Sequence, residues 1–392
     1  MKPLRILLVS LLLCASADTF ANGQCNADCQ RLINEGNALG GQGKYREALE
    51  RFKAAEAAEP QSSVPVSMAA GLVLGLAEGA PPDKKDGVRA MARALAERAV
   101  GLFADDPIAH EVLRRLDDGA VSPLHAPNAE AGKPFARGEA LFAQQQYEKA
   151  LEQYQLAMAA DPAFSNAWVA AGNTWFYRGD WGKAEALFRQ ATAIEPHNAQ
   201  AWRYLASSLA RQGDRDGAEK ALLTAIAADP SQRPNWIALS ALRSSLAMPL
   251  KPLALRRGVR VEEGSDGKYT IGLDALEKRG KGTPDHAFRL ALGMSELQAR
   301  TVAGHAQISP FAIELASWRQ AIKIINEAQA KEGKGLSDPA LLQMLAFERD
   351  GQLEAALLIL QFRQAWRPDL QAWLAAHPGG VKTFIDRYGV RP

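Results

Sequence analysis

Apolar, small and proline positions recur at a 34-residue spacing in the middle of the chain. In one copy these positions are Trp168, Gly172, Trp175, Ala184, Phe188, Ala191 and Pro196. Residues of the same kinds stand one spacing later, from Trp202 to Pro230, and one spacing earlier, from Pro134 to Pro162. Small residues suit close helix contacts, large residues cover a neighbour, and proline ends a helix. The pattern therefore predicts helical hairpins in tandem.

A fourth copy stands near the N-terminus, with matching positions at Leu32, Gly36, Leu39, Ala48, Phe52, Ala55 and Pro60. In spacing and in residue types, the four copies resemble the tetratricopeptide repeat. The resemblance implies an all-α fold in which helical hairpins stack into a right-handed solenoid. It also implies that the protein binds other proteins and does not catalyse a reaction.

The remaining sequence is helical with one interruption. We predict helices over 64–78, 87–103 and 108–116, a linker over 118–133, and a capping helix over 236–246 that ends before Pro249 and Pro252. Residues 259–261 and 269–271 alternate around a Gly-rich turn at 264–267, which predicts a β-hairpin that must pack on helices or on a partner. Further helices are expected over 285–302, 310–331, 339–347 and 353–365.

These patterns divide the chain into five parts. They are a signal peptide over 1–21, an N-terminal repeat-like hairpin over 22–62, a diverged helical hairpin with a linker over 63–130, three tandem repeats with a capping helix over 131–248, and a C-terminal helical region over 249–392 with a β-hairpin near 257–274. Within the last part, Gly351, Ala356, Leu360 and Pro368 keep repeat-like spacing, so 337–370 is a candidate degenerate hairpin. Arg363 argues against it, because a small residue is expected there.

The N-terminus predicts export. Lys2 and Arg5 precede an apolar run over 6–14, and small residues follow, so cleavage is expected after Ala17 or Ala21. A periplasmic location is the usual one for such chains, with secretion, acylation of Cys14 and an uncleaved anchor as the alternatives. After cleavage only Cys25 and Cys29 remain, and an exported chain is expected to join them in a disulfide.

The repeat resemblance implies a binding surface on the inward face of each leading helix. The predicted partner-binding residues are Glu139, Phe142, Asn166, Asn173, Phe176, Tyr177, Arg203 and Arg211. Asparagine can hold a peptide backbone through a donor and an acceptor, aromatic rings can anchor apolar side chains, and arginine can pair with a carboxylate. Packing between repeats is the competing role for the three aromatic residues, and helix capping or solvation is the competing role for the asparagines.

No constellation of catalytic or metal-binding residues stands out in the sequence. The six histidines are scattered, and no nucleophile elbow or phosphate loop is present, so we expect neither a cofactor nor a metal. A net charge of +2 gives no argument for nucleic acid. The basic residues around the hairpin, Lys251, Arg256, Arg257, Arg260, Lys278, Arg279 and Lys281, are either a solvated edge or a weak contact with an anionic envelope surface.

Two other classes of function stay open from the sequence. A cell-wall or glycan-associated module would use exposed tryptophans in the C-terminal region, with Trp366 and Trp373 as the candidates. An unrecognised C-terminal active site would need a pocket lined by converging acids or by His305. The main expectation remains a scaffold that binds a peptide or helix of other envelope proteins.

Overall fold

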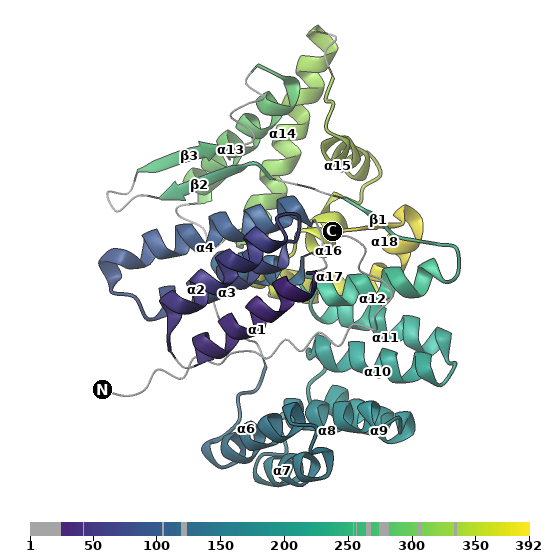
Figure 1. Cartoon of the computed structure of the whole chain (residues 1–392). Coiled ribbons are helices and arrows are strands. Elements are labelled where there is room, and N and C mark those ends of the chain that lie inside the picture. The colour runs from purple at the N-terminus through teal and green to yellow at the C-terminus, as the bar shows by residue number, and fades with distance from the viewer. Residues whose placement is uncertain are drawn as a thin grey trace. The chain divides into compact units, whose positions relative to one another are not determined.

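The computed structural model describes residues 25–41, 43–103, 106–118, 124–253, 255, 257–263, 268–273, 282–303, 308–332 and 335–392. The predicted signal peptide lies outside this range. Within the described residues the chain forms eighteen α-helices and two small two-stranded sheets. They divide into two compact units, an N-terminal unit that ends at residue 118 and a C-terminal unit that begins at residue 124 (Figure 1).

The N-terminal unit consists of five helices, α1 (Ala27–Gly41), α2 (Tyr45–Ala58), α3 (Val64–Glu78), α4 (Pro82–Leu102) and α5 (Pro107–Asp118). Gly36 on α1 faces the ring of Phe52 on α2, where an added Cβ would lie 2.6 Å from a ring carbon. Helix α3 has the predicted bounds, whereas α4 begins at Pro82 instead of residue 87. Proline is favoured in the first turn of a helix, which explains the earlier start.

The C-terminal unit opens with seven helices in tandem, which we call the tandem repeats. They are α6 (Ala129–Ala143), α7 (Tyr147–Ala160), α8 (Ser165–Tyr177), α9 (Trp181–Ile194), α10 (Ala199–Arg211), α11 (Arg215–Ala228) and the capping helix α12 (Arg233–Ser244). A Cβ added at Gly172 would lie 2.7 Å from the Phe188 ring, and one at Gly138 would lie 2.5 Å from the Tyr154 ring. In the third repeat the equivalent residues are Ala206 and Leu222. Where alanine replaces the glycine, the facing phenylalanine is thus replaced by the smaller leucine.

The two helices of each repeat are joined by the same turn. Gly179 and Gly213 have φ angles of +80° and +88°, and Gln145 occupies the equivalent position with a φ of +58°. In each case the next backbone N–H donates to a carbonyl five residues earlier, as from Asp180 to Trp175 at 3.1 Å. Such a left-handed residue closes a helix end by satisfying carbonyls that lack a helical partner. The turn therefore fixes the antiparallel course of each hairpin.

After α12 the chain forms the C-terminal region, over 249–392. Strand β2 (Val259–Glu263) pairs antiparallel with β3 (Tyr269–Leu273), and Val259 lies opposite Leu273. The predicted turn at 264–267 lies outside the described residues. The hairpin packs on α13 (Pro284–Ala303) at Gly293, where a Cβ would lie 2.7 Å from Val259. The expectation that this hairpin packs on a helix is therefore confirmed.

Five helical segments complete the C-terminal region: α14 (Pro310–Glu332), α15 (Pro339–Arg349), α16 (Leu353–Leu360), α17 (Arg367–Ala376) and α18 (Gly380–Tyr388). The predicted helix over 353–365 is wrong in its second half, because α16 ends at Leu360 and a short 3₁₀ turn over 364–366 leads into α17. Pro368 stands in the first turn of α17, where its fixed φ favours a new helix start. Every residue of α16 except Glu354 is buried.

The C-terminal region is attached to the end of the tandem repeats. Strand β4 (Val390–Arg391) pairs in parallel with β1 (Lys251–Pro252), directly after the capping helix. The buried Arg243 of α12 forms ion pairs with Glu219 of α11 and Asp386 of α18, each at 2.6 Å. One continuous buried core joins the later repeats to this region, so the unit has a closed end there.

Candidate partner-binding surface

The predicted partner-binding residues lie on three leading helices of the tandem repeats. Helix α8 contacts both α6 and α10, so the three helices follow one another along the stack (Figure 1). Each leading helix begins after a proline-containing loop, and α10 is capped by the buried Asn198, whose side chain accepts from the Ala201 N–H at 3.0 Å. The repeat spacing thereby fixes which side chains stand at equivalent places.

Two of the predicted residues are engaged within the protein. The Tyr154 hydroxyl donates to Glu139 at 2.6 Å, and burial together with this hydrogen bond raises the pKa of Tyr154 well above its ordinary value. Asn166 accepts a hydrogen bond of 3.0 Å from the side-chain amide of Asn198. Glu139 and Asn166 therefore help to join one helix to the next, whether or not they also contact a partner.

The three predicted aromatic residues form one group across two repeats. The rings of Phe142 and Tyr177 meet edge to face with centroids 5.4 Å apart, and Phe176 lies 6.4 Å from Tyr177. Tyr147 extends the group, 5.6 Å from Phe142. Tyr177 is 39% exposed, whereas the other three rings are half-buried. The group links neighbouring repeats and still presents apolar surface to solvent.

Asn173 and Arg203 differ from Glu139 and Asn166. The half-buried side chain of Asn173 has no hydrogen-bond partner among the described residues. The Arg203 guanidinium lies over the Tyr204 ring, 4.7 Å from its centroid, and its buried Nε has no acceptor in that same part of the chain. A buried donor without an acceptor costs free energy, about 1–3 kcal/mol. The ring thus holds a guanidinium that has no acid partner within the described residues.

Arg211, the last predicted residue, is exposed at the end of α10. The sequence reasoning missed a neighbouring feature on α8 and α9. Two cations lie over the Trp175 ring, Arg178 at 4.7 Å and Lys183 at 4.2 Å from its centroid. The sequence did contain a signal for this contact, because Trp175, Arg178 and Lys183 stand close together around the turn at Gly179. A tight turn brings both cations back over the ring.

Comparison with known families agrees with this geometry. A tetratricopeptide repeat model matches residues 176–242, and a second tetratricopeptide repeat model matches residues 33–78. The chain contains tetratricopeptide repeats. The predicted fold class, an all-α solenoid of tetratricopeptide hairpins with only short strands, is confirmed.

Solved structures with tetratricopeptide repeats show weak overall similarity to the chain. The Sgt2 domain from Aspergillus fumigatus is 24% identical, with 32% of this chain and 85% of that one covered at a TM-score of 0.30. The first such domain of Spaghetti (RPAP3), bound to the HSP90 peptide SRMEEVD, is 20% identical over 31% and 98% of the chains, with a TM-score of 0.29. The repeat protein TTC0263 from Thermus thermophilus is 19% identical over 55% and 99%, with a TM-score of 0.26.

A comparison with curated proteins returns no match. Among the described residues, no helix combines the length and apolar composition needed to cross a membrane. In the same part of the chain, no group of three or more histidine, cysteine or acidic residues is placed to hold a metal ion.

Beyond the repeats, the structure corrects the expected basic surface. Arg257 is not at the surface, because it forms buried ion pairs with Glu296 and Glu314. Its Nε donates to Glu314 at 2.9 Å, and the Trp318 indole donates to the same carboxylate at 2.8 Å. Arg256, Lys278, Arg279 and Lys281 lie outside the described residues. Arg257 is therefore a core residue and does not contribute to an anionic-surface contact.

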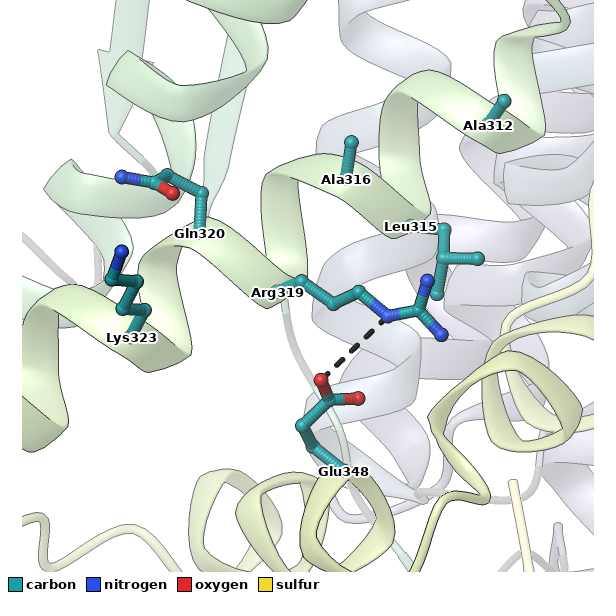
Figure 2. A pocket seen from close by; sticks show the side chains of 7 residues that line it. All are labelled: Ala312, Leu315, Ala316, Arg319, Gln320, Lys323 and Glu348. Atoms are coloured by element: carbon teal, nitrogen blue, oxygen red, sulfur yellow. Dashed lines mark ion pairs between the residues drawn. The ribbon is translucent and has the colours of Figure 1, made fainter.

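The glycan-module alternative required exposed tryptophans in the C-terminal region, and this requirement is not met. Trp366 and Trp373 are only 2% and 8% exposed, so they pack in the core and cannot form a sugar-stacking surface. His305, the residue proposed for an enzyme site, lies outside the described residues. A groove of about 640 Å³ lies on α14, but a single acid, Glu348, lines it (Figure 2). It therefore lacks the converging acids that the enzyme alternative required.

The two remaining cysteines lie close together at the start of α1. Their Cα atoms are 5.3 Å apart, with the sulfur atoms in contact. This separation is within the range found for disulfides. The disulfide itself remains a prediction, because it depends on an oxidising compartment.

Proposed function

We propose that this protein is a non-enzymatic scaffold that binds an extended segment of a partner protein along the leading helices of its tandem repeats. The observation that carries the proposal is the pair Asn173 and Arg203. They stand on adjacent leading helices, half-buried, without a polar partner among the described residues. A polar side chain at a repeat surface that has no partner within the protein is available to bind a polar group of another chain.

The chemistry of the surface defines the segment. Arg203, fixed by the Tyr204 ring, would pair with a carboxylate, and Asn173 would hold the backbone through its amide. The aromatic group of Phe142, Phe176 and Tyr177 would take an apolar side chain. Each well-desolvated anchor contributes about 1–3 kcal/mol. The favoured ligand is a segment that combines an acidic residue with an apolar one.

The attachment of the C-terminal region is compatible with an open binding surface. Arg367 donates to the Ala228 carbonyl, Gln364 donates to Asp229, and Gln371 lies 3.3 Å from His197. These three repeat residues lie at the end of α11 and in the loops between repeats, and they are not on the leading helices. These three contacts therefore do not involve the helices that carry Asn173 and Arg203.

We also propose that the protein acts in the cell envelope, most simply the periplasm. Support comes from the N-terminal sequence and from the paired cysteines near it. Mass spectrometry of the purified protein tests both the cleavage of the signal peptide and the Cys25–Cys29 disulfide. Export predicts an N-terminus at Asp18 or Asn22 and a Cys25–Cys29 peptide that resists alkylation until it is reduced. An intact Met1 together with free thiols at Cys25 and Cys29 would contradict the proposal.

The binding proposal is tested by replacing Asn173 and Arg203 together with alanine. Partners cross-linked to the wild-type protein in cells are identified and quantified, and the same experiment is run with the double variant. The expected result is loss of specific partners with little change in melting temperature, because neither side chain has a polar partner among the described residues. A control variant replaces the exposed Gln190 and Lys220 on α9 and α11.

The control should retain the same partners as the wild type. Equal loss of partners in both variants would refute binding through the leading helices. A large drop in the melting temperature of the Asn173/Arg203 variant alone would mean that these side chains serve the fold. Either result leaves the repeat architecture unaffected, so the test addresses the surface alone.

A further inference from the structure

A second surface lies away from the tandem repeats, on the long helix α14. Six residues of α14, Ala312, Leu315, Ala316, Arg319, Gln320 and Lys323, line a groove of about 640 Å³. Glu348 of α15 completes the lining (Figure 2). The α14 residues are spaced by three and four, so they form one stripe along the helix. At 1.5 Å per residue the stripe is about 16 Å long, or three helical turns.

The opposite side of α14 is firmly held. Trp318 is buried against Phe288 of α13, with ring centroids 5.6 Å apart, and Glu314 is fixed by the Arg257 ion pair. These contacts anchor the helix, so the stripe is presented on a rigid element. A rigid, pre-formed surface reduces the entropy lost when a partner binds.

The floor of the groove suits another helix. Ala312 and Ala316 are small, and Leu315 between them supplies an apolar contact. Small side chains allow two helix axes to approach to about 8–10 Å. All backbone groups in the middle of α14 are used within the helix, so an added β-strand would find no hydrogen bonds there. The surface therefore favours side-chain packing by a helix.

The charges at one end of the groove define the partner further. Arg319 reaches toward Glu348, but their atoms are 3.6 Å apart and the Arg319 side chain is 52% exposed, so this ion pair contributes little (Figure 2). Lys323 has no ion-pair partner among the described residues. Two cations with one loosely held acid leave the rim positively charged. Acidic side chains on a bound helix would complement it.

We propose that the α14 groove binds an amphipathic helix of a partner protein, with small and apolar residues on its inner face and acidic residues along its flank. The apolar face packs on Ala312, Leu315 and Ala316, and the flanking carboxylates meet Arg319 and Lys323. This site is separate from the surface on the leading helices. The two proposals can therefore fail independently.

The test uses two synthetic helical peptides of eighteen residues, capped at both ends and labelled with a fluorophore. Both carry leucine and alanine at positions three and four apart, with glutamate on the flanks of one peptide and lysine on the flanks of the other. Binding to the full-length protein is measured by fluorescence anisotropy. The acidic peptide should bind about tenfold more tightly than the basic one.

Three variants locate the binding. Ala316→Arg should remove binding of the acidic peptide, because the long side chain fills the groove. R319E with K323E should reverse the preference, so that the basic peptide binds more tightly. Glu348→Gln should strengthen acidic-peptide binding about two- to threefold, because Arg319 loses its internal partner. As a matched control, Lys220→Glu changes the charge of an exposed helix elsewhere and should leave both affinities unchanged.

Several outcomes would overturn the proposal. They are equal binding of the two peptides, no measurable binding of either, or the same effect from Lys220→Glu as from R319E with K323E. Sedimentation of the wild type and of Ala316→Arg tests a second copy of the chain as the occupant. A wild-type dimer that Ala316→Arg converts to a monomer would replace the proposed partner helix with self-association. Circular dichroism of each variant confirms that the fold is retained.

Discussion

Helices α15 and α16 of the C-terminal region and the hairpin α8–α9 of the tandem repeats are joined by the same kind of turn but differ in their surroundings. Gly351 has a φ of +69°, and the next N–H donates to the Phe347 carbonyl at 2.7 Å, as in the repeat turn at Gly179. Helix α9 nevertheless exposes one side, whereas seven of the eight residues of α16 are buried. The turn is thus set locally, and the burial is set by the rest of the fold.

The residues around the turn explain this difference. Gly172 stands seven residues before its turn glycine and receives the Phe188 ring, whereas Met344 stands seven residues before Gly351. Helix α16, with the sequence Leu-Glu-Ala-Ala-Leu-Leu-Ile-Leu, is apolar on every side. A helix of that kind has to be covered on all sides, whereas an amphipathic helix needs only one neighbouring layer. Helices α15 and α16 therefore share the turn of a repeat, while α16 belongs to the core of the C-terminal region.

The largest expected loss of stability comes from the buried charges of the C-terminal region. Arg257→Met leaves the buried Glu314 without its ion-pair partner and leaves Glu296 with Arg300 alone. Breaking a buried pair from one side costs about 3–5 kcal/mol in the free energy of unfolding. Denaturant unfolding at pH 7 should show this loss. The tandem repeats contain no comparable pair of buried acids bridged by one arginine among their described residues.

The same variant has a diagnostic pH dependence. In the wild type, burial raises the pKa of Glu314, but the charges of Arg257 and Arg363 and the hydrogen bonds from Arg257 and Trp318 outweigh burial and hold this pKa below its ordinary value. The resulting stability is present above the unfolded pKa of about 4.3 and is lost as the pH falls through the folded value. Without Arg257, burial dominates and the Glu314 pKa rises. The stability loss caused by the variant should then be smaller at pH 5 than at pH 8, and a pH-independent loss would contradict the assignment.

An intermediate effect is expected from the close contact inside the second repeat. Gly172→Leu places a side chain against the Phe188 ring, where even a Cβ would lie at 2.7 Å. Overpacking of this kind costs about 1–3 kcal/mol. Thermal unfolding should record a lower melting temperature for the variant, and unchanged stability would contradict the helix contact.

The third repeat supplies the compensating change. Gly172→Ala combined with Phe188→Leu reproduces the pair Ala206 and Leu222 that the third repeat already uses. The double variant should be more stable than Gly172→Ala alone, because the smaller leucine makes room for the added methyl group. A double variant less stable than either single variant would show that the two repeats pack differently.

The smallest effect tests the feature that the two regions share. Gly179→Ala and Gly351→Ala force a side chain into a left-handed conformation and should each cost about 1 kcal/mol. Gln145→Gly, at a φ of +58°, should instead stabilise the first repeat by up to about 1 kcal/mol. Chemical denaturation of the three variants gives the comparison. Opposite effects at Gly179 and Gly351 would mean that the turns are not equivalent.

The sequence was informative where structure depends on nearby residues. The repeat positions predicted the tandem hairpins and the cap, because close contacts and turns act within one spacing. It was uninformative about Arg257, a loop residue whose partner Glu314 lies 57 residues away on α14. The two-residue pairing of β1 with β4 is also too short to leave a periodic signal.

In the candidate surface, too, the sequence predicted the local placement of residues but not their contacts with other helices. Helical spacing placed Asn173 and Arg203 on adjacent leading helices, but it gave no sign that Tyr154 and Asn198 hold Glu139 and Asn166. Tyr154 lies on α7 and Asn198 is the N-cap residue of α10, so only the packed fold shows which predicted residues are already engaged. The α14 stripe was visible as a helix in the sequence, and its open side depends on where α15 lies.

The pairing of Val390–Arg391 with Lys251–Pro252 has a consequence for the order in which the fold forms. The contacts inside each tandem hairpin join residues that are close in sequence, whereas this strand pair joins residues that are far apart. Contacts between distant residues form more slowly, because the chain loses more loop entropy before they stabilise it. We therefore expect the tandem hairpins to form before the C-terminal region closes. The apolar side chains of α16 lack their full cover until then.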